Sequence, residues 1–459
     1  MAEAKDLLLI YPRLRYPSGD PPLGILYLAG YLRQKLGMVP EILDLSFAKN
    51  PWQTLCQKLE EKKYQWIGIS AMVTMAESSE KVAELVRSLQ PRAKIILGGP
   101  HPTTLPEKCQ SKNFDFLVLG EGEETFAQLL GKGTGEGVEG VWFRVDGHWE
   151  KNPSRTPLQD LDQIPFPAFD LVDLSLYQKY WFQLDTLGKP ISGTNILASR
   201  GCPFQCTFCQ PTLERLFGKK LRKRSPKNII QELFWLKERF GIQGFIFADD
   251  TLIVDKNWCR ELAREMLAQN LGLVFGANVR AELVEEDTLR ALKEAGLRKI
   301  YLGIESWSDR IRREVLGKNF TREEVEQAVS TAKKLDLKIQ GYFMLGAPGE
   351  SREEVKKTLK YARQLGLDDI TINLTTPLPG TYLYQKYHSQ IEAEEKDFDY
   401  YRRWVFKKGE LSQRWLRAQQ ILGYFGFYLR PKKFFKILRE NLSPKMLART
   451  GLKLKRVLG

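Results

Sequence analysis

The chain has 459 residues, of which 43% are hydrophobic, so it can form two or three domains with sizeable cores and is not a disordered protein. Its net charge of +14 is concentrated at one end, because residues 406–459 contain fourteen Lys or Arg and two Glu. This distribution argues against a protein that binds nucleic acid with its whole surface, and it indicates a basic C-terminal appendage.

Cysteine usage and the lack of long apolar stretches favour an intracellular protein. Of the six cysteines, Cys56, Cys109 and Cys259 occur singly, which is not the pattern of a disulfide framework. The first residues, MAEAKDLLLIYP, lack the apolar stretch and cleavage site of a signal peptide. No segment approaches the roughly eighteen consecutive apolar residues of a membrane-spanning helix. We therefore expect a reducing, cytoplasmic location.

Residues 5–130 alternate strand and helix signals, the pattern of a doubly wound parallel sheet with helices on both faces. Strands are predicted over LLLIY (7–11), EILDLS (41–46), WIGISAM (66–72), KIILGG (94–99) and FDFLVLG (114–120), and helices over GILYLAGYLRQKLG (24–37), SSEKVAELVRSLQ (78–90) and EGEETFAQLLG (121–131). Ligands of such sheets bind at the carboxyl ends of the strands, which here contain Ser70, Gly98–Gly99 and Gly120.

The middle of the chain separates two α/β domains. VWFRVDGHWEK (141–151) predicts a hairpin that turns at Asp146–Gly147. We place the first domain, Rossmann-like, at residues 1–150. The proline-rich residues 151–190 are interpreted as an extended linker.

A second series of six strand–helix units predicts a partial (β/α)6 barrel at residues 191–395. Its strands are expected over TNILAS (194–199), GFIFAD (244–249), LVFGANV (273–279), KIYLGIE (299–305), KIQGYFML (338–345) and DITINLT (369–375). Functional residues of a parallel barrel lie just after its strands. A basic, aromatic and helical region is expected at 396–459.

The segment SRGCPFQCTFCQP (199–211) follows the first barrel strand and contains Cys202, Cys206 and Cys209. Three thiolates on one short loop can hold a metal centre. A structural zinc site needs four ligands, and neither a further CxxC pair nor an HxxxH pair is present. An iron–sulfur cube held by three thiolates instead leaves one iron open for a substrate or cofactor.

CPFQCTFC, with the aromatic Phe208 before its last cysteine, resembles the CxxxCxxC signature of radical S-adenosylmethionine (SAM) enzymes. The resemblance implies that Cys202, Cys206 and Cys209 ligate a [4Fe–4S] cluster. It also implies that the open iron chelates the amino and carboxylate groups of SAM. Reductive cleavage of SAM then yields a 5′-deoxyadenosyl radical, which removes hydrogen from the substrate.

Further segments at the barrel mouth are similar to those with which this family binds SAM. They are GFIFADDTL, NVRAELV, YLGIES and GYFMLGAPGES. Each has a plainer interpretation: a helix cap for either aspartate, a surface salt bridge for the arginine or the glutamate, and a turn for the glycine. With Phe208, the residues that the resemblance assigns to SAM are Asp249, Asp250, Arg280, Glu305, Ser306 and Gly346.

The first domain resembles the cobalamin-binding domain of cobalamin-dependent radical SAM enzymes. The segments PPLGILYLAGYLRQKLG, ILDLS, GISAMVTM, ILGGPHPT and LVLGEGEETF occur in that family's order, and no GxGxxG or P-loop follows the first strand to favour a generic nucleotide-binding domain. The residues that the resemblance assigns to cobalamin are Leu23, Gly24, Ser70, Met72, Val73, Gly98, Gly99, His101, Gly120 and Gly122.

The DxHxxG motif of the classical cobalamin fold is missing, and the corresponding loop reads PRLRYPSGDPPLG. No histidine there can ligate cobalt from below, a feature that many of the radical enzymes share. His101 is interpreted as a loop residue beside the nucleotide tail. A domain that binds no corrinoid remains the alternative.

The resemblance implies a cobalamin-dependent methyltransferase that acts on an unactivated carbon. The alternatives are oxidative cyclisation, ring contraction or carbon–carbon coupling on a tetrapyrrole or lipid, and a non-catalytic corrinoid- or redox-sensing protein. We expect a small-molecule, lipid or tetrapyrrole substrate, an external electron donor such as flavodoxin or ferredoxin, and no nucleic acid. For the tail, we consider a cap over the barrel, a solvated charged face, and peripheral contact with the inner face of the membrane.

Overall fold

The computed structural model describes residues 6–14, 17–394, 397–399, 403–407, 409–431, 433 and 435. The chain divides into two compact units. Unit 1 comprises Met1–Lys179 and Pro211–Arg222, and unit 2 comprises Tyr180–Gln210 and Lys223–Gly459. The linker and the domain boundaries expected from the sequence stay a prediction.

Unit 1 is built on a seven-stranded sheet, sheet A, whose strand order is β2-β1-β3-β4-β5-β6-β7. The first five strands along this order are parallel, which confirms the predicted doubly wound topology. The strands are β1 (Leu7–Tyr11), β2 (Glu41–Asp44), β3 (Trp66–Ser70), β4 (Lys94–Gly98), β5 (Phe116–Val118), β6 (Val141–Val145) and β7 (His148–Lys151). The helices are α1 (Leu23–Leu36), α2 (Pro51–Glu61), α3 (Ala76–Leu89), α4 (Pro100–Thr104), α5 (Gly122–Lys132), α6 (Leu174–Tyr180) and α7 (Thr212–Phe217).

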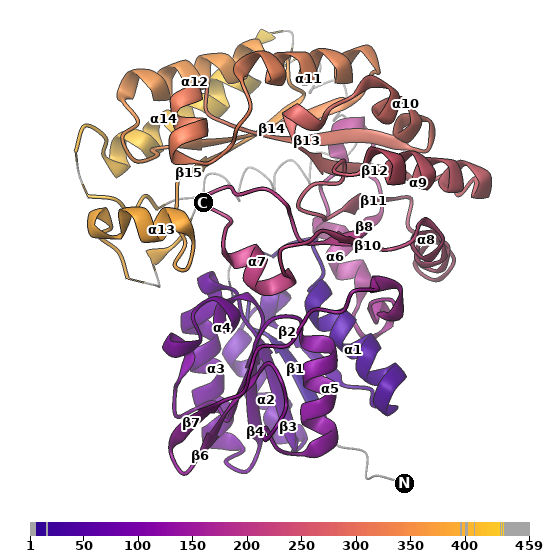
Figure 1. Ribbon diagram of the computed structural model, residues 1–459, viewed down its shortest axis with the longest axis vertical. Helices are drawn as coiled ribbons and strands as arrows, with labels where there is room; N and C mark the ends of the chain where they lie inside the picture. The colour runs from indigo at the N-terminus through magenta and orange to yellow at the C-terminus, as the bar shows by residue number, and fades with distance from the viewer. Residues whose placement is uncertain are drawn as a thin grey trace. The chain divides into compact units, whose positions relative to one another are not determined.

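Alternating residues of β1 enter two different cores. Leu7 and Leu9 pack with side chains of α1 and α5 on one face of sheet A. Leu8 and Ile10 pack with side chains of α2 and α3 on the other face. Apolar residues at every position of a strand thus predict burial on both faces. Figure 1 shows helices on both sides of sheet A.

The predicted hairpin is confirmed: β6 and β7 pair antiparallel and extend the parallel sheet. Asp146 and Gly147 have φ values of 47° and 86°. These left-handed conformations match the type I′ turn that the Asp–Gly pair favours.

Unit 2 contains a second sheet, sheet B, of six parallel strands in the order β15-β14-β13-β12-β11-β8, which confirms the predicted partial barrel. Its strands are β8 (Gly193–Ile196), β11 (Gly244–Phe247), β12 (Val274–Val279), β13 (Leu297–Glu305), β14 (Lys338–Leu345) and β15 (Asp369–Leu374). Short strands β9 (Ser199–Arg200) and β10 (Arg222–Lys223) flank the cysteine loop and α7. The helices are α8 (Pro226–Phe240), α9 (Lys256–Gln269), α10 (Glu286–Glu294), α11 (Arg322–Lys334), α12 (Arg352–Gln364), α13 (Tyr382–Tyr387) and α14 (Gln413–Tyr428).

The amino-terminal end of the barrel is filled by the segment before β8. Trp181, Leu184 and Ile191 form one core cluster with Ile246 and Tyr301. A Cβ on Gly193 would lie 2.3 Å from a ring carbon of Trp181, so only glycine permits this contact. The interior is therefore packed at this end, and chemistry is restricted to the carboxyl ends of the strands.

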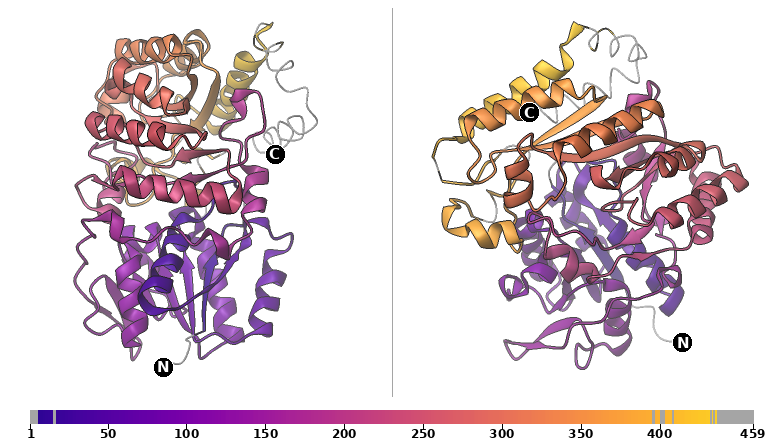
Figure 2. Two further views of the ribbon diagram at one scale, coloured as in Figure 1. Left: turned by 90° about the vertical axis from the view of Figure 1, so that its right-hand side faces the viewer. Right: turned by 45° about the horizontal axis from the view of Figure 1, so that its top comes forward.

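Helix α14 lies along the edge of sheet B, beside α12, as the yellow helix of Figure 2. The amide of Ile372 on β15 donates to the hydroxyl of Tyr424 (2.9 Å), and Gln420 donates to the carbonyl of Ile372 (2.6 Å). Side chains of α14 thus satisfy backbone groups that an edge strand leaves unpaired. Residues 436–459 of the predicted basic tail lie outside the described residues.

Within the part of the chain that the structure describes, no helix has the length and apolar character that a membrane crossing requires.

Candidate functional site

The cysteine loop follows β9 and is fixed by backbone hydrogen bonds. The amides of Cys209 and Gln210 both donate to the carbonyl of Cys206, at 3.0 and 2.9 Å. Thr207 ties the loop to the segment after β13, because its amide donates to the carbonyl of Leu316 and its hydroxyl to that of Val315. The loop is therefore held in shape before any ligand binds.

The three thiols of this loop lie within electrostatic reach of one another. The pKa of Cys202 is raised to about 11, mainly by burial and also by the charges of Asp250 and Cys206, while Arg280 opposes the shift. Burial also raises the pKa of Cys209, with additional raising contributions from Cys206, Asp250 and Cys202. Iron binding must displace these protons, because metals bind the thiolate.

The thiols do not form a single-ion site. Among the residues described, no three His, Cys, Asp or Glu side chains are grouped closely enough to hold one metal ion. In an iron–sulfur cube each cysteine ligates a different iron, so its thiolates are spaced more widely than those of a mononuclear zinc site. The all-sulfur donor set and its spacing fit such a cluster.

Arg280 lies against this loop, directly after β12. Its Nη1 donates to the Sγ of Cys206 at 3.0 Å, and its Nε donates to Glu282 at 2.7 Å. The guanidinium also lies 3.8 Å from the ring centroid of Phe204. The Arg280 guanidinium thus contacts the cysteine loop. The pairing of Arg280 with the SAM carboxylate stays a prediction.

The two predicted aspartates after β11 have different surroundings. Asp249 is buried and accepts hydrogen bonds from the amide of Ala198 (3.0 Å) and the hydroxyl of Ser199, so it anchors the strand end that leads to the cysteine loop. Asp250 is exposed, and its charge acts on Cys202 and Cys209. Only Asp250 is thus placed to meet a ligand.

Glu305 ends β13 in a left-handed conformation with a φ of 65°, at an irregularity in its pairing with β14. Non-glycine residues adopt this conformation rarely, and residues that do so are enriched at functional sites. The buried Glu305 carboxylate accepts from the Nζ of Lys318 at 2.6 Å. Lys318 also acts on the Cys209 thiol, lowering its pKa, and lies 5.7 Å from the ring centroid of Phe208.

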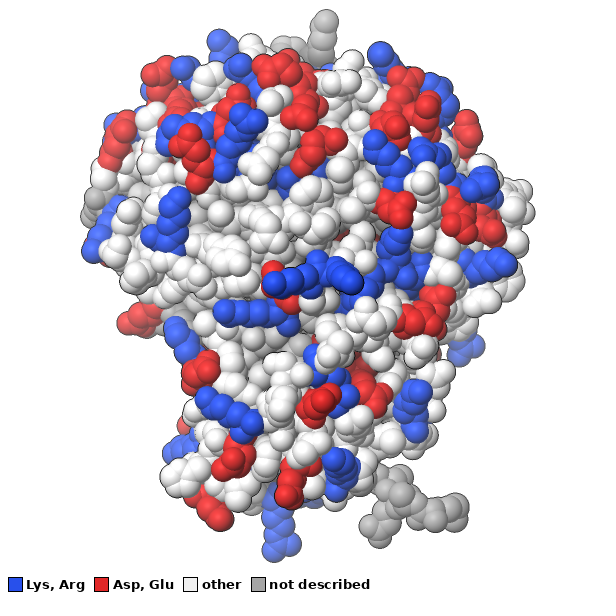
Figure 3. All heavy atoms as spheres, viewed as in Figure 1, with Lys and Arg blue, Asp and Glu red and all other residues white. Residues whose placement is uncertain are grey.

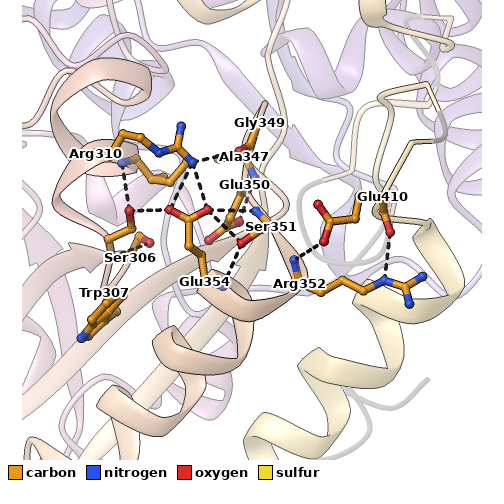
Figure 4. A network of polar contacts seen from close by, with 12 residues as sticks. Ser306, Trp307, Arg310, Ala347, Gly349, Glu350, Ser351, Arg352, Glu354 and Glu410 are labelled. Carbon is orange, nitrogen blue, oxygen red and sulfur yellow. Dashed lines mark hydrogen bonds and ion pairs between the residues drawn. The ribbon is translucent and has the colours of Figure 1, made fainter.

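Ser306 is fully buried, and its hydroxyl lies 3.2 Å from that of Thr358 on α12. Glu354 strengthens this connection, because it accepts from Ser308 (2.7 Å) and from Arg310 (2.9 Å) (Figure 4). Glu354 also completes the capping box that begins α12 at Ser351. These bonds hold the ends of β13 and β14 together, while ligand contact by Ser306 stays a prediction.

Gly346 follows β14 with a φ of 80°, where only glycine fits. Its amide donates to the buried carboxylate of Glu350 at 2.7 Å, and its carbonyl accepts from the indole of Trp404 at 2.7 Å. Burial raises the pKa of Glu350 to about 8, although the amides of Gly346 and Ala347 oppose this shift. Trp404 thus connects the C-terminal region to this strand end.

In unit 1, the predicted cobalamin residues include three at neighbouring strand ends. Ser70 pairs with Gly98 in the register of β3 and β4. Gly99 has a φ of 95°, and a Cβ there would lie 3.0 Å from the Ala71 carbonyl oxygen and 3.1 Å from the Ser70 hydroxyl. The hydroxyl of Thr103 donates to the carbonyl of Gly99 (2.8 Å) and accepts from the amide of Gly120 (2.9 Å).

The other predicted cobalamin residues surround this sheet edge in different ways. Met72 is 37% exposed directly after β3, whereas Val73 is buried in the turn that follows. His101 is buried in α4, with its amide bonded to the Ala71 carbonyl. Leu23 and Gly24 begin α1, and Gly122 begins α5. The glycine-lined edge fits a large planar ligand that approaches backbone closely.

Several residues near the cysteine loop were not predicted. They are Ser199, Phe204, Glu282, Lys318, Glu350 and Trp404. Ser199, Phe204, Glu282 and Glu350 lie within segments that the sequence analysis singled out, so a motif could have identified them. Lys318 and Trp404 lie outside those segments and are brought to their partners only by the fold.

Both units match known family profiles. The profile of the radical SAM superfamily matches residues 196–382, and that of the B12 binding domain matches residues 17–130.

Similar proteins include an uncharacterised methyltransferase, PH0819, of Pyrococcus horikoshii, with 31% identity over 92% of this chain and 90% of that protein. The anaerobic magnesium-protoporphyrin IX monomethyl ester cyclase of Rubrivivax gelatinosus is 26% identical over 86% of this chain and 72% of that protein. The fold is similar to that of TsrM from Kitasatospora setae, a radical SAM methyltransferase solved with cobalamin and a [4Fe–4S] cluster. The TM-score is 0.70 at 18% identity, covering 84% of this chain and 75% of that one.

Proposed function

Because the chain belongs to the cobalamin-dependent family of radical SAM enzymes, we propose that it is a methyltransferase that methylates an unactivated carbon atom of a small molecule. It is an enzyme, and its cofactors are a [4Fe–4S] cluster, SAM and cobalamin. When bound, these groups supply two things: a carbon-centred radical, which removes hydrogen from the substrate, and a methyl group, which is transferred to it.

The observation that supports this proposal best is the cysteine loop at the mouth of the barrel, in a chain that also contains a B12 binding domain. Cys202, Cys206 and Cys209 are the cluster ligands in this proposal. The hydrogen bond from Arg280 to the Sγ of Cys206 stabilises negative charge on that sulfur.

Charged side chains around the loop orient SAM in the proposal. Asp250 is available to accept a hydrogen bond from the amino or ribose groups, because it is exposed beside the thiols. The ion pair of Glu305 and Lys318 presents both signs of charge near Cys209, and Gly346 offers close backbone approach for the adenine. Phe208 shields this side of the loop within an apolar cluster.

In unit 1, we propose that the edge formed by Ser70, Gly98 and Gly99 binds cobalamin, with Gly120 beside it. Within the described residues, the histidines are His101, His148 and His388. His101 is buried in α4, and His148 lies on the exposed hairpin strand β7. We therefore propose that no imidazole of unit 1 ligates cobalt.

Isotope transfer tests the proposal before the substrate is known. We would reconstitute the full chain anaerobically with iron, sulfide and hydroxocobalamin, add reductant and SAM with a deuterated methyl group, and analyse extracted corrinoid and 5′-deoxyadenosine by mass spectrometry. A deuterated methyl group on the corrinoid, together with 5′-deoxyadenosine, is expected. Iron loading and 5′-deoxyadenosine without corrinoid methylation would overturn the methyltransferase assignment.

A second candidate is oxidative cyclisation, ring contraction or carbon–carbon coupling on a tetrapyrrole or lipid. The cyclase of Rubrivivax gelatinosus, 26% identical to this chain, favours this candidate. It predicts a product without an added CH2 group and no methyl label on the corrinoid. For either reaction we propose flavodoxin or ferredoxin as the external electron donor.

A further inference from the structure

Helix α14 buries one face and exposes an apolar row on another. Leu416, Gln420, Gly423 and Phe427 are buried. Leu422, Phe425 and Leu429 are 59%, 48% and 57% exposed. Spacings of three and four residues place these three side chains in one row along the helix, which we call the α14 stripe. Single exposed apolar residues are normal on protein surfaces, whereas several that are contiguous on one helix face are a candidate interaction surface.

The helix cannot turn to bury the α14 stripe. Gln420 and Tyr424 bond the backbone of Ile372 on β15, which fixes the rotation of α14 about its axis. Lys433 lies 3.5 Å from the ring centroid of Phe427 and donates to the carbonyl of Leu367 at 2.7 Å, which fixes the end of the helix. Rotation would break these bonds and expose Phe427.

The segment of the sequence that contains the stripe is basic. Residues 413–433 contain five Lys or Arg and no Asp or Glu, and residues 406–459 have a net charge of +12. Elsewhere the signs are mixed: the face of the molecule in Figure 3 shows positive and negative side chains interspersed. An apolar row within a segment that is basic throughout has the composition of a helix that rests in a membrane interface.

We infer that the α14 stripe docks the enzyme onto an anionic lipid surface, with its three apolar side chains in the interfacial region and the basic side chains of α14 and the residues just after it at the headgroups. A second copy of the chain fits less well, because pairing the same face of two chains would bring the basic segments together. A membrane-spanning role does not apply to α14, which lacks the length for it. This inference goes beyond the proposed reaction, since it assigns the surface on which the enzyme works.

Cosedimentation of the full chain with vesicles tests the inference. We expect binding to vesicles of phosphatidylcholine with phosphatidylserine, weaker binding at high salt, and little binding to phosphatidylcholine alone. The triple variant L422Q/F425Q/L429Q should lose about tenfold or more in partitioning, because three apolar anchors are removed.

The control is the double variant F234Q/L267Q, which removes two similarly exposed apolar residues, 57% and 45% exposed, from α8 and α9. It should bind vesicles like the unmodified chain. The thermal unfolding midpoint and the iron content should be the same in the unmodified chain, the stripe variant and the control. Equal values would show that lost vesicle binding reflects neither misfolding nor a damaged cluster site.

Three outcomes would overturn the inference. They are no binding to anionic vesicles, equal loss in the stripe variant and the control, and a solution mass that halves in the stripe variant. The last result would show that the α14 stripe joins two copies of the chain.

Discussion

The two predicted binding regions differ in the chemical groups that form them. At the cysteine loop of unit 2, charged side chains dominate: Arg280 bonds Cys206, and Lys318 pairs with Glu305. At the strand ends of unit 1, glycine and hydroxyl groups dominate, and a Cβ on Gly99 would lie 3.0 Å from the Ala71 carbonyl oxygen and 3.1 Å from the Ser70 hydroxyl. From this comparison we expect unit 2 to bind its ligands by charge and thiolate chemistry, and unit 1 to bind its ligand by shape and close approach to the backbone.

The largest effect should come from removing the thiols, because they are the proposed cluster ligands and the described residues contain no other group of His, Cys, Asp or Glu side chains that could hold a metal ion. The triple variant C202A/C206A/C209A should fall from about four irons per chain to almost none after reconstitution, and it should form no 5′-deoxyadenosine. Iron analysis and mass spectrometry measure both. Cys56→Ala, at a partly exposed cysteine of α2, is the control and should keep its iron. Retained 5′-deoxyadenosine in the triple variant would falsify the cluster assignment.

The next largest effect concerns the buried ion pair. Lys318→Met leaves the Glu305 carboxylate buried without its partner, so the free energy of unfolding should fall by about 3–5 kcal/mol. Lys81→Met, which breaks the exposed pair with Glu77 on α3, should cost less than about 1 kcal/mol. Chemical denaturation of the apoprotein compares them. Similar losses in both variants would show that the side chains around the cysteine loop are not energetically coupled.

A smaller, pH-dependent effect is expected at Glu350. Its pKa rises from an ordinary value of 4.5 to about 8 in the folded chain because of burial. The folded state therefore retains a proton that the unfolded state releases, and stability falls as the pH rises from about 4.5 to about 8. Glu350→Gln keeps an acceptor for the Gly346 amide but cannot titrate. The free energy of unfolding of this variant should therefore fall by about 2–4 kcal/mol less than that of the unmodified chain over this pH range.

Denaturation curves at pH 5 through pH 9 measure the slope, with the exposed Glu410→Gln as the control. If the variant and the unmodified chain lose stability in parallel over this range, Glu350 is not the titrating group.

The smallest effect on stability is expected in unit 1. Gly99→Ala forces a side chain into a φ of 95° and close to the Ala71 carbonyl, which should cost about 1–3 kcal/mol. Corrinoid binding should weaken about tenfold, while the iron content stays unchanged, because the cysteine loop is untouched. Equilibrium dialysis with hydroxocobalamin measures the affinity.

Gly131→Ala is the matched control, since Gly131 lies in α5 with no atom within 4 Å of an added Cβ. It should bind corrinoid normally. Equally weakened corrinoid binding in both variants would show that close contact between the ligand and the backbone at Gly99 is not what unit 1 recognises.

The sequence indicated those parts of the site that lie close together along the chain. The cysteines could be identified because ligand spacing on one loop is a local property. The strands were visible because burial on both faces gives uninterrupted apolar runs, as in LLLIY. The hairpin was visible because Asp146 and Gly147 suit one turn type.

The contacts that individual side chains make at the site could not be predicted from the sequence. Arg280 was predicted at the site, but its hydrogen bond to Cys206 joins residues 74 positions apart. Asp249 and Asp250 are adjacent in sequence, yet one anchors a strand end and the other affects the thiols. Lys318 was not predicted, since its partner Glu305 is reached only through the irregular end of β13.

The sequence by itself thus identified the proposed cluster ligands, the two α/β folds and the basic character of the C-terminal region. Only the tertiary structure decided which charges face the thiols, how α14 closes the edge of sheet B, and which apolar residues α14 leaves exposed. The physical reason is that ligand spacing, apolar periodicity and turn chemistry act over a few residues. Ion pairs, edge coverage and exposure depend instead on segments that only folding brings together.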